Sequence, residues 1–186
     1  MRKPTTRSTL ALLALSLALL TPSAHAQQDV HAPLVPPANR KPAPAFHLLD
    51  ETGKTKQPSS YRGKIVLLNF WATTCGGCIL EIPSFIDIEK AYQGKPFTAV
   101  GIAMDISYDD LKSPDEAWAK VRPFVAKHHL NYPIIMGDTT IASTYKLEAY
   151  PATYLLDKSG RIAATYVGVV SKADIESNLN KLLLEK

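Results

Sequence analysis

Cysteine is nearly absent from this sequence. The 186 residues include only two, Cys75 and Cys78, which stand three positions apart. A protein that uses disulfides for stability ties distant segments of its chain together, and two neighbouring cysteines cannot do so. The pair is therefore expected to carry chemistry rather than to staple the fold.

Long apolar runs are also lacking. The one candidate, residues 10–20, has eleven residues, whereas a membrane-spanning helix needs about 20. Basic residues precede this run, no acidic residue occurs before Asp29, and Ala24-His25-Ala26 follows with small residues at the two positions that a signal peptidase reads. These features are typical of a secretory signal peptide. We expect residues 1–26 to be cleaved off and the mature protein to be periplasmic, with a retained membrane anchor as the alternative.

A marked excess of one charge is missing as well. The precursor has 21 basic and 17 acidic side chains, and loss of residues 1–26 leaves 18 against 17. With no basic stripe, nucleic acid is not an expected partner. Removal of residues 1–26 leaves a mature chain of 160 residues, which is the size of one domain. We expect a monomer with no stable membrane insertion.

The remaining chain predicts one α/β domain. Residues 27–44, rich in Pro and Ala, are interpreted as a flexible linker, and residues 45–186 as the domain. Buried-strand patterns and amphipathic helical patterns alternate along it. The expected strands are 46–50, 65–70, 97–104, 132–135, 153–157 and 161–167, and the expected helices are 75–92, 115–129, 139–146 and 171–184. This order predicts a central mixed sheet with helices on both faces.

The cysteine pair falls where a buried strand passes into a helix. Cys75 is thereby expected in the first turn, where unpaired backbone N–H groups and the helix dipole favour an anion. This position should lower the pKa of the Cys75 thiol. Cys75 is therefore predicted to attack, and Cys78, one turn inward, to resolve the mixed disulfide.

Glu81 follows Cys78 by three residues, so the two side chains share a helix face. We expect Glu81 to be buried near the sulfurs, with its pKa raised by desolvation and like charge, and to accept the proton of Cys78. Asn69, the one polar residue in the preceding apolar run, stands six residues before Cys75. The alternative is an exposed acid that complements the helix dipole.

The segment Phe70-Trp71-Ala72-Thr73-Thr74-Cys75-Gly76-Gly77-Cys78 resembles the active-site segment of thioredoxin-like proteins. Tyr61 to Trp71, the Glu81-Ile82-Pro83 step and Tyr150-Pro151 are similar to motifs of the exported reductases of the TlpA/ResA type. Thr74 stands where that family usually has Trp, and Asn69 stands where thioredoxins carry a buried acid.

This resemblance implies a thioredoxin fold and a thiol-disulfide oxidoreductase that needs no cofactor. It also implies a cis bond before Pro151, beside Cys75, at which client peptides pair. The expected partners are client protein disulfides, as in cytochrome c maturation or assembly of an oxidase copper site, and an upstream electron donor in the membrane.

Two cysteines three positions apart could also serve a metal site or another enzyme. A zinc site would need two more soft ligands, and none of the remaining histidines is spaced to supply them. A copper metallochaperone would use a longer cysteine spacing plus a histidine, for which His128 and His129 are the nearest candidates. A thiol peroxidase would resemble a Pro-x-x-x-Thr-x-x-Cys pattern, but Leu67 and Ala72 occupy those positions.

Overall fold

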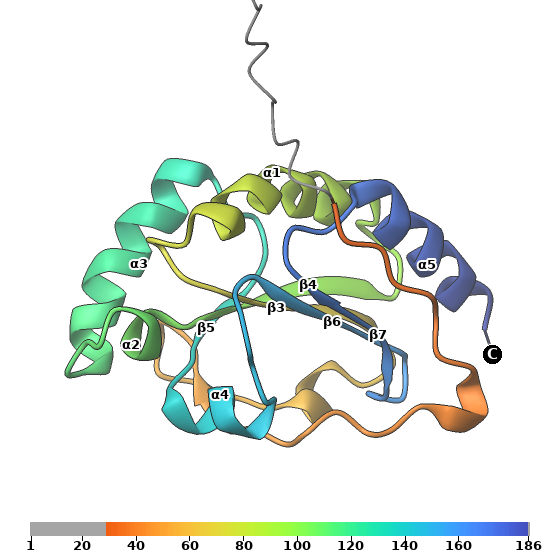
Figure 1. Ribbon diagram of the computed structural model, residues 1–186, viewed down its shortest axis with the longest axis horizontal. Helices are drawn as coiled ribbons and strands as arrows, with labels where there is room; N and C mark the ends of the chain where they lie inside the picture. Colours follow the sequence, from red (N-terminus) through yellow and green to blue (C-terminus); the bar gives the residue numbers. More distant parts are fainter. Residues whose placement is uncertain (1–28, 186) are drawn as a thin grey trace, which may run out of the picture.

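A computed structural model describes residues 29–185 of the chain. The predicted signal peptide lies outside the described residues. Figure 1 shows a central sheet between two layers of helices. The strands are β1 (Leu48–Leu49), β2 (Thr55–Lys56), β3 (Ile65–Trp71), β4 (Phe97–Ala103), β5 (Ile134–Met136), β6 (Ala152–Leu156) and β7 (Ile162–Val167). The α-helices are α1 (Gly76–Ala91), α2 (Asp105–Tyr108), α3 (Pro114–His128), α4 (Thr139–Thr144) and α5 (Lys172–Leu184), with short 3-10 turns η1 (Pro37–Asn39) and η2 (Pro58–Tyr61).

The main sheet has five strands in the order β5-β4-β3-β6-β7. β3 pairs in parallel with β4 and antiparallel with β6, so the sheet is mixed. Every residue of β3 and β4 is buried, as expected for central strands covered on both faces. The predicted mixed sheet with helices on both faces is confirmed.

Alternation along β3 separates two cores. Ile65, Leu67 and Trp71 face the layer formed by α1, α3 and α5, whereas Val66, Leu68 and Phe70 face α4 and the β1 region. In Figure 1 α1 and α5 lie above the sheet, α3 lies at its left and α4 lies below it. The period of two in side-chain direction therefore aims Asn69 into the same layer as α1.

The described part of the predicted linker, residues 29–44, pairs with the domain at two places. Val30 forms a parallel bridge with Val170, and Pro42 forms an antiparallel bridge with Arg161. The Arg40 side chain is 1% exposed and contacts carboxylates of Asp157 and Glu185. Composition indicated a solvated chain, but this pairing with the domain decides the conformation (Figure 1, orange segment beside α5).

The long elements agree with the sequence predictions to within a few residues, and the short ones less well. The predicted strand at residues 46–50 is reduced to β1, and α2 was not predicted at all. α2 has four residues, too few to show an apolar period. No helix within residues 29–185 combines the length and apolar character that crossing a membrane requires.

Candidate active site

The two cysteines lie where the sequence places them, between β3 and α1. They form a disulfide with their Cα atoms 5.3 Å apart. Cys75 is the N-cap residue of α1, and its sulfur accepts the backbone N–H of Cys78 at 3.3 Å. In the reduced protein this sulfur would be a thiolate, which the same N–H and the start of the helix stabilise. The geometry thus favours Cys75 as the more acidic thiol.

Glu81 lies on α1 one turn beyond Cys78, and it is 1% exposed. Its Oε1 atom accepts a hydrogen bond from Asn69 Nδ2 at 3.1 Å, and the same amide donates to Thr153 Oγ1 at 3.0 Å. Burial raises the pKa of the Glu81 carboxyl to about 8, while the backbone of Val170 and the bond from Asn69 act in the opposite direction. An acid with this pKa can exchange a proton near neutral pH.

The predicted burial of Glu81 is therefore confirmed, and desolvation is the main cause of its raised pKa. The exposed position that a purely dipole-complementing acid would occupy is excluded by its 1% exposure. Asn69 holds the carboxyl from the neighbouring strand, so the residue that replaces the acid of thioredoxins directly contacts Glu81. Its catalytic role stays a prediction.

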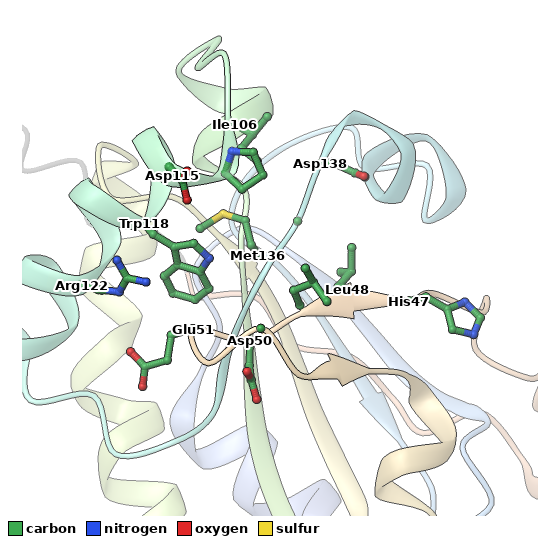
Figure 2. A pocket seen from close by; sticks show the side chains of 14 residues that line it. His47, Leu48, Asp50, Glu51, Ile106, Asp115, Trp118, Arg122, Met136 and Asp138 are labelled. Atoms are coloured by element: carbon green, nitrogen blue, oxygen red, sulfur yellow. The ribbon is translucent and has the colours of Figure 1, made fainter.

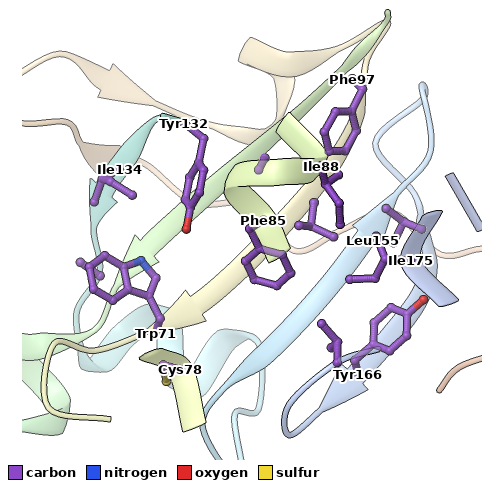
Figure 3. Close-up of a cluster of buried hydrophobic side chains, with 14 of the residues drawn as sticks. Trp71, Cys78, Phe85, Ile88, Phe97, Tyr132, Ile134, Leu155, Tyr166 and Ile175 are labelled. Carbon is purple, nitrogen blue, oxygen red and sulfur yellow. The ribbon is translucent and has the colours of Figure 1, made fainter. Parts of the chain in front are cut away.

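Other polar atoms are buried in the same layer. Glu81 Oε2, Trp71 Nε1 and Tyr132 Oη have no hydrogen-bond partner among the described residues. Burial, and then the charge of Glu81, raise the pKa of Tyr132. Figure 3 shows the Tyr132 hydroxyl directed toward the Trp71 side of the cluster that contains Cys78. Unpaired buried polar groups cost stability and tend to occur at functional sites.

A glycine in β4 makes room for this arrangement. Gly101 pairs with Asn69 in the sheet. A Cβ atom at position 101 would lie 2.7 Å from Trp71 Nε1 and 3.3 Å from the Tyr132 ring. The two aromatic side chains therefore occupy the space that any larger residue at position 101 would fill.

Pro151 follows a cis peptide bond after Tyr150, as predicted. Its position in the sheet is set by β6, because Ala152 pairs with Phe70 of β3. Pro151 thus lies beside the C-terminal end of β3, from which the chain continues toward Cys75. The Tyr150 ring meets Tyr108 of α2 edge-on, with centroids 5.3 Å apart. The contact between Pro151 and Cys75 remains a prediction.

Sequence reasoning missed the acids of the segment that follows β4. Asp105 and Asp109 accept hydrogen bonds from Thr73 and Thr74, the residues that precede Cys75. The only available signal was acidic residues directly after a buried strand, which by itself indicates no partner. Pairing of β3 with β4 brings the two segments together.

A separate cavity of about 360 Å³ lies between β1, β5 and α3, and Figure 2 shows Trp118, Arg122 and Met136 on its walls. None of the predicted site residues lines it. In the part of the chain described, no group of three or more His, Cys, Asp or Glu residues is placed to hold a metal ion. The predicted site residues therefore lie around the disulfide and not in this cavity.

Comparison with known proteins agrees with this assignment. The family model described as "AhpC/TSA family" matches residues 40–165. The chain is 33% identical over 138 residues to the thioredoxin-like protein YneN of Bacillus subtilis, covering 74% of this chain and 76% of YneN. It is 32% identical over 143 residues to the thiol-disulfide oxidoreductase ResA of Bacillus cereus, covering 76% and 77%.

A crystal structure of a thiol:disulfide interchange protein of the thioredoxin family from Chlorobium tepidum is also similar. It superposes with a TM-score of 0.65 at 27% identity, covering 77% of this chain and 97% of that one. The redox pair, the sheet order and these relatives all indicate the same family and reaction class. The chain belongs to the AhpC/TSA family and is a ResA-like thiol-disulfide oxidoreductase of the thioredoxin superfamily.

Proposed function

We propose that this protein is a periplasmic reductase of client protein disulfides, exported by residues 1–26. The observation that carries the proposal is the buried Glu81 carboxyl one turn behind a disulfide at a helix N-terminus. This arrangement supplies a stabilised attacking thiolate and, behind it, a base suited to neutral pH.

The reaction begins from the reduced pair. The Cys75 thiolate attacks one sulfur of the client disulfide, a Cys75–client disulfide forms, and the other client sulfur leaves as a thiolate. In the reduced protein the N–H of Cys78, which donates to the Cys75 sulfur in the disulfide form, would stabilise the Cys75 thiolate and so favour its attack.

Resolution uses the inner cysteine. Cys78 loses its proton to Glu81 and attacks the Cys75 sulfur, and the client is released with its second sulfur reduced. The client gains two electrons, and the protein is left with the Cys75–Cys78 disulfide. An upstream dithiol, supplied by a membrane electron donor, returns two electrons and completes the cycle.

The loop before β6 supplies the client-facing surface. With the bond before Pro151 cis, the backbone of Tyr150 is proposed to pair with an extended client segment. Clients of the proposed reaction are disulfides of apocytochrome c or of an oxidase copper site. The relative named ResA supports the reaction class, and the clients are identified by the trapping experiment below.

The test is a trapping experiment with matched variants. Cys78→Ser removes the resolving thiol and should accumulate mixed disulfides in cells, which mass spectrometry of the attached protein identifies. Cys75→Ser should abolish insulin disulfide reduction and trap nothing, and the double variant gives the background. Near-normal reduction by Cys75→Ser would refute the mechanism.

The same samples discriminate the two other functions. A thiol peroxidase would consume hydrogen peroxide with thiol reductant at a rate that Cys75→Ser abolishes, whereas the proposed reductase should show no such turnover. A copper chaperone would retain one copper ion per chain after dialysis. Detection of either activity without client trapping would overturn the proposal.

A further inference from the structure

A four-residue turn presents Cys75 to its surroundings. After β3 ends, the N–H of Cys75 donates to the carbonyl of Ala72 at 3.2 Å and closes the turn. Thr73 and Thr74 are its two central residues. Since Cys75 is both the last residue of the turn and the N-cap of α1, the conformation of the turn sets where the sulfur lies.

Both central residues of the turn are tied to the segment that follows β4. Asp105 Oδ1 accepts the Thr73 N–H at 3.1 Å and the Thr73 hydroxyl at 2.5 Å. Asp109 Oδ1 accepts the Thr74 hydroxyl at 2.7 Å, and the other Asp109 oxygen pairs with Lys120 at 3.1 Å. Two carboxylates therefore hold two successive residues immediately before the nucleophile.

Of the two acids, Asp105 is the more unusual. It is completely buried, and its Oδ2 atom has no hydrogen-bond partner within residues 29–185. No salt bridge reaches it there, and the nearest charged group acting on it is Asp109. Burial raises the pKa of this carboxyl, while the two bonds from Thr73 oppose the rise. A buried acid of this kind lowers stability, yet within residues 29–185 its side chain accepts hydrogen bonds from Thr73 alone.

We propose that Asp105 is a positioning residue for the redox reaction. By holding Thr73 it keeps the turn in place, so that Cys75 stays at the N-cap of α1 when the disulfide opens. In the oxidised protein the S–S bond itself restrains Cys75. In the dithiol form that bond is absent, and the turn with its tethers, together with the bond from the Ile79 N–H to the Cys75 carbonyl, would keep the sulfur beside the N–H of Cys78.

This proposal rests on the proposed function in taking Cys75 as the attacking thiol. The physical consequence concerns its acidity. A hydrogen bond to a thiolate favours the charged form, so release of the turn should weaken that bond and raise the pKa of the Cys75 thiol. The same α2 segment contacts Tyr150 through Tyr108, so Asp105 also links the cysteine turn to the loop before Pro151.

The experiment measures the Cys75 thiol directly. In a Cys78→Ala background, the rate of alkylation by iodoacetamide is followed from pH 4 to pH 10 for three proteins. Asp105→Ala removes both acceptor bonds and should slow alkylation below the thiol pKa by about tenfold. Asp105→Asn keeps an oxygen that can accept both bonds and should retain a profile close to that of the parent.

A control separates positioning from general loss of stability. Asp157→Asn changes another buried acid, at the opposite end of β6 from Ala152, and should leave the alkylation profile unchanged. If Asp105→Ala does not fold, Thr73→Val decides, because it deletes only the hydroxyl bond. Thr73→Val should shift the profile in the same direction, and Thr73→Ser should restore it.

Two results would overturn the proposal. One is an unchanged profile in folded Asp105→Ala, or in Thr73→Val if the former does not fold. The other is an equal loss in Asp105→Asn, which would assign the effect to charge rather than to the tether. Since alkylation involves no client, either result is independent of whether Cys78→Ser traps one.

Discussion

The raised pKa of Glu81 has a direct consequence for stability. The carboxyl has a pKa of about 8 in the folded protein and an ordinary pKa near 4.3 when the chain unfolds. Below pH 4 the Glu81 carboxyl is protonated in both the folded and the unfolded state, so its ionisation does not lower the stability of the protein. Between these two values the unfolded state releases the proton while the folded state keeps it, so the folded state binds more protons and its stability falls as pH rises.

The size of the effect follows from the two pKa values. Each pKa unit corresponds to about 1.4 kcal/mol. The gap at Glu81 therefore amounts to as much as about 5 kcal/mol of lost stability between pH 4 and pH 8, as an upper bound. Glu81→Gln cannot ionise but keeps an oxygen for the hydrogen bond from Asn69, so it should lack this component of the pH dependence.

The assay is urea unfolding of the oxidised protein at several pH values from 4 to 9. The free energy of unfolding of Glu81→Gln minus that of the natural protein should increase with pH across this range. Subtraction removes the titration of all other groups. Glu148→Gln, at an exposed position, should follow the natural protein throughout.

Parallel curves for Glu81→Gln and the natural protein would refute the reasoning, because they would mean that the buried carboxyl ionises as easily as an exposed one. The functional counterpart is measured on the same variant. Glu81→Gln should slow client reduction and alter the thiol titration. Unchanged rates and thiol pKa values from pH 5 to pH 9 would remove Glu81 from the mechanism.

Further outcomes are expected elsewhere in the molecule. Arg40→Ala should destabilise the protein by about 1.5–3 kcal/mol in urea unfolding, because it removes a buried guanidinium that bonds Asp157 and Glu185. A loss below about 0.5 kcal/mol would mean that this anchor does not hold the N-terminal segment to the domain. Gly101→Ala should cost about 1–3 kcal/mol through its clash with Trp71, and a neutral effect would show that the indole moves freely. Purified, untagged mature protein should retain neither zinc nor copper after dialysis, and one metal ion per chain would contradict this.

Much of the candidate site could be read from local sequence. Cys75 and Cys78 were predicted as the redox pair because a buried strand followed by a helix places a first-turn residue at unpaired N–H groups. Glu81 was predicted because a spacing of three on a helix is a spatial relationship. The fold class followed for the same reason, since alternation and helical period are properties of neighbouring residues.

The prediction of a cis bond before Pro151 came from a different source. Only about 5–6% of X–Pro bonds in folded proteins are cis, so a proline by itself does not predict one, and the expectation came from resemblance to a family. The structure agrees with that resemblance. For the N-terminal segment, Pro and Ala content predicted a flexible linker. The carboxylate partners of Arg40 in this segment lie more than 100 positions away, where local composition gives no sign of them.

By itself, the sequence determined the cysteine pair, its place at a helix start and the neighbouring acid, because each depends on spacing within one helix turn. Only the tertiary structure decided which groups surround that pair. Asn69 meets Glu81 because β3 packs beneath α1, and Asp105 meets Thr73 because β4 pairs with β3. Such contacts join residues 12 and 32 positions apart, and no local periodicity encodes them because they arise from the pairing and packing of whole elements.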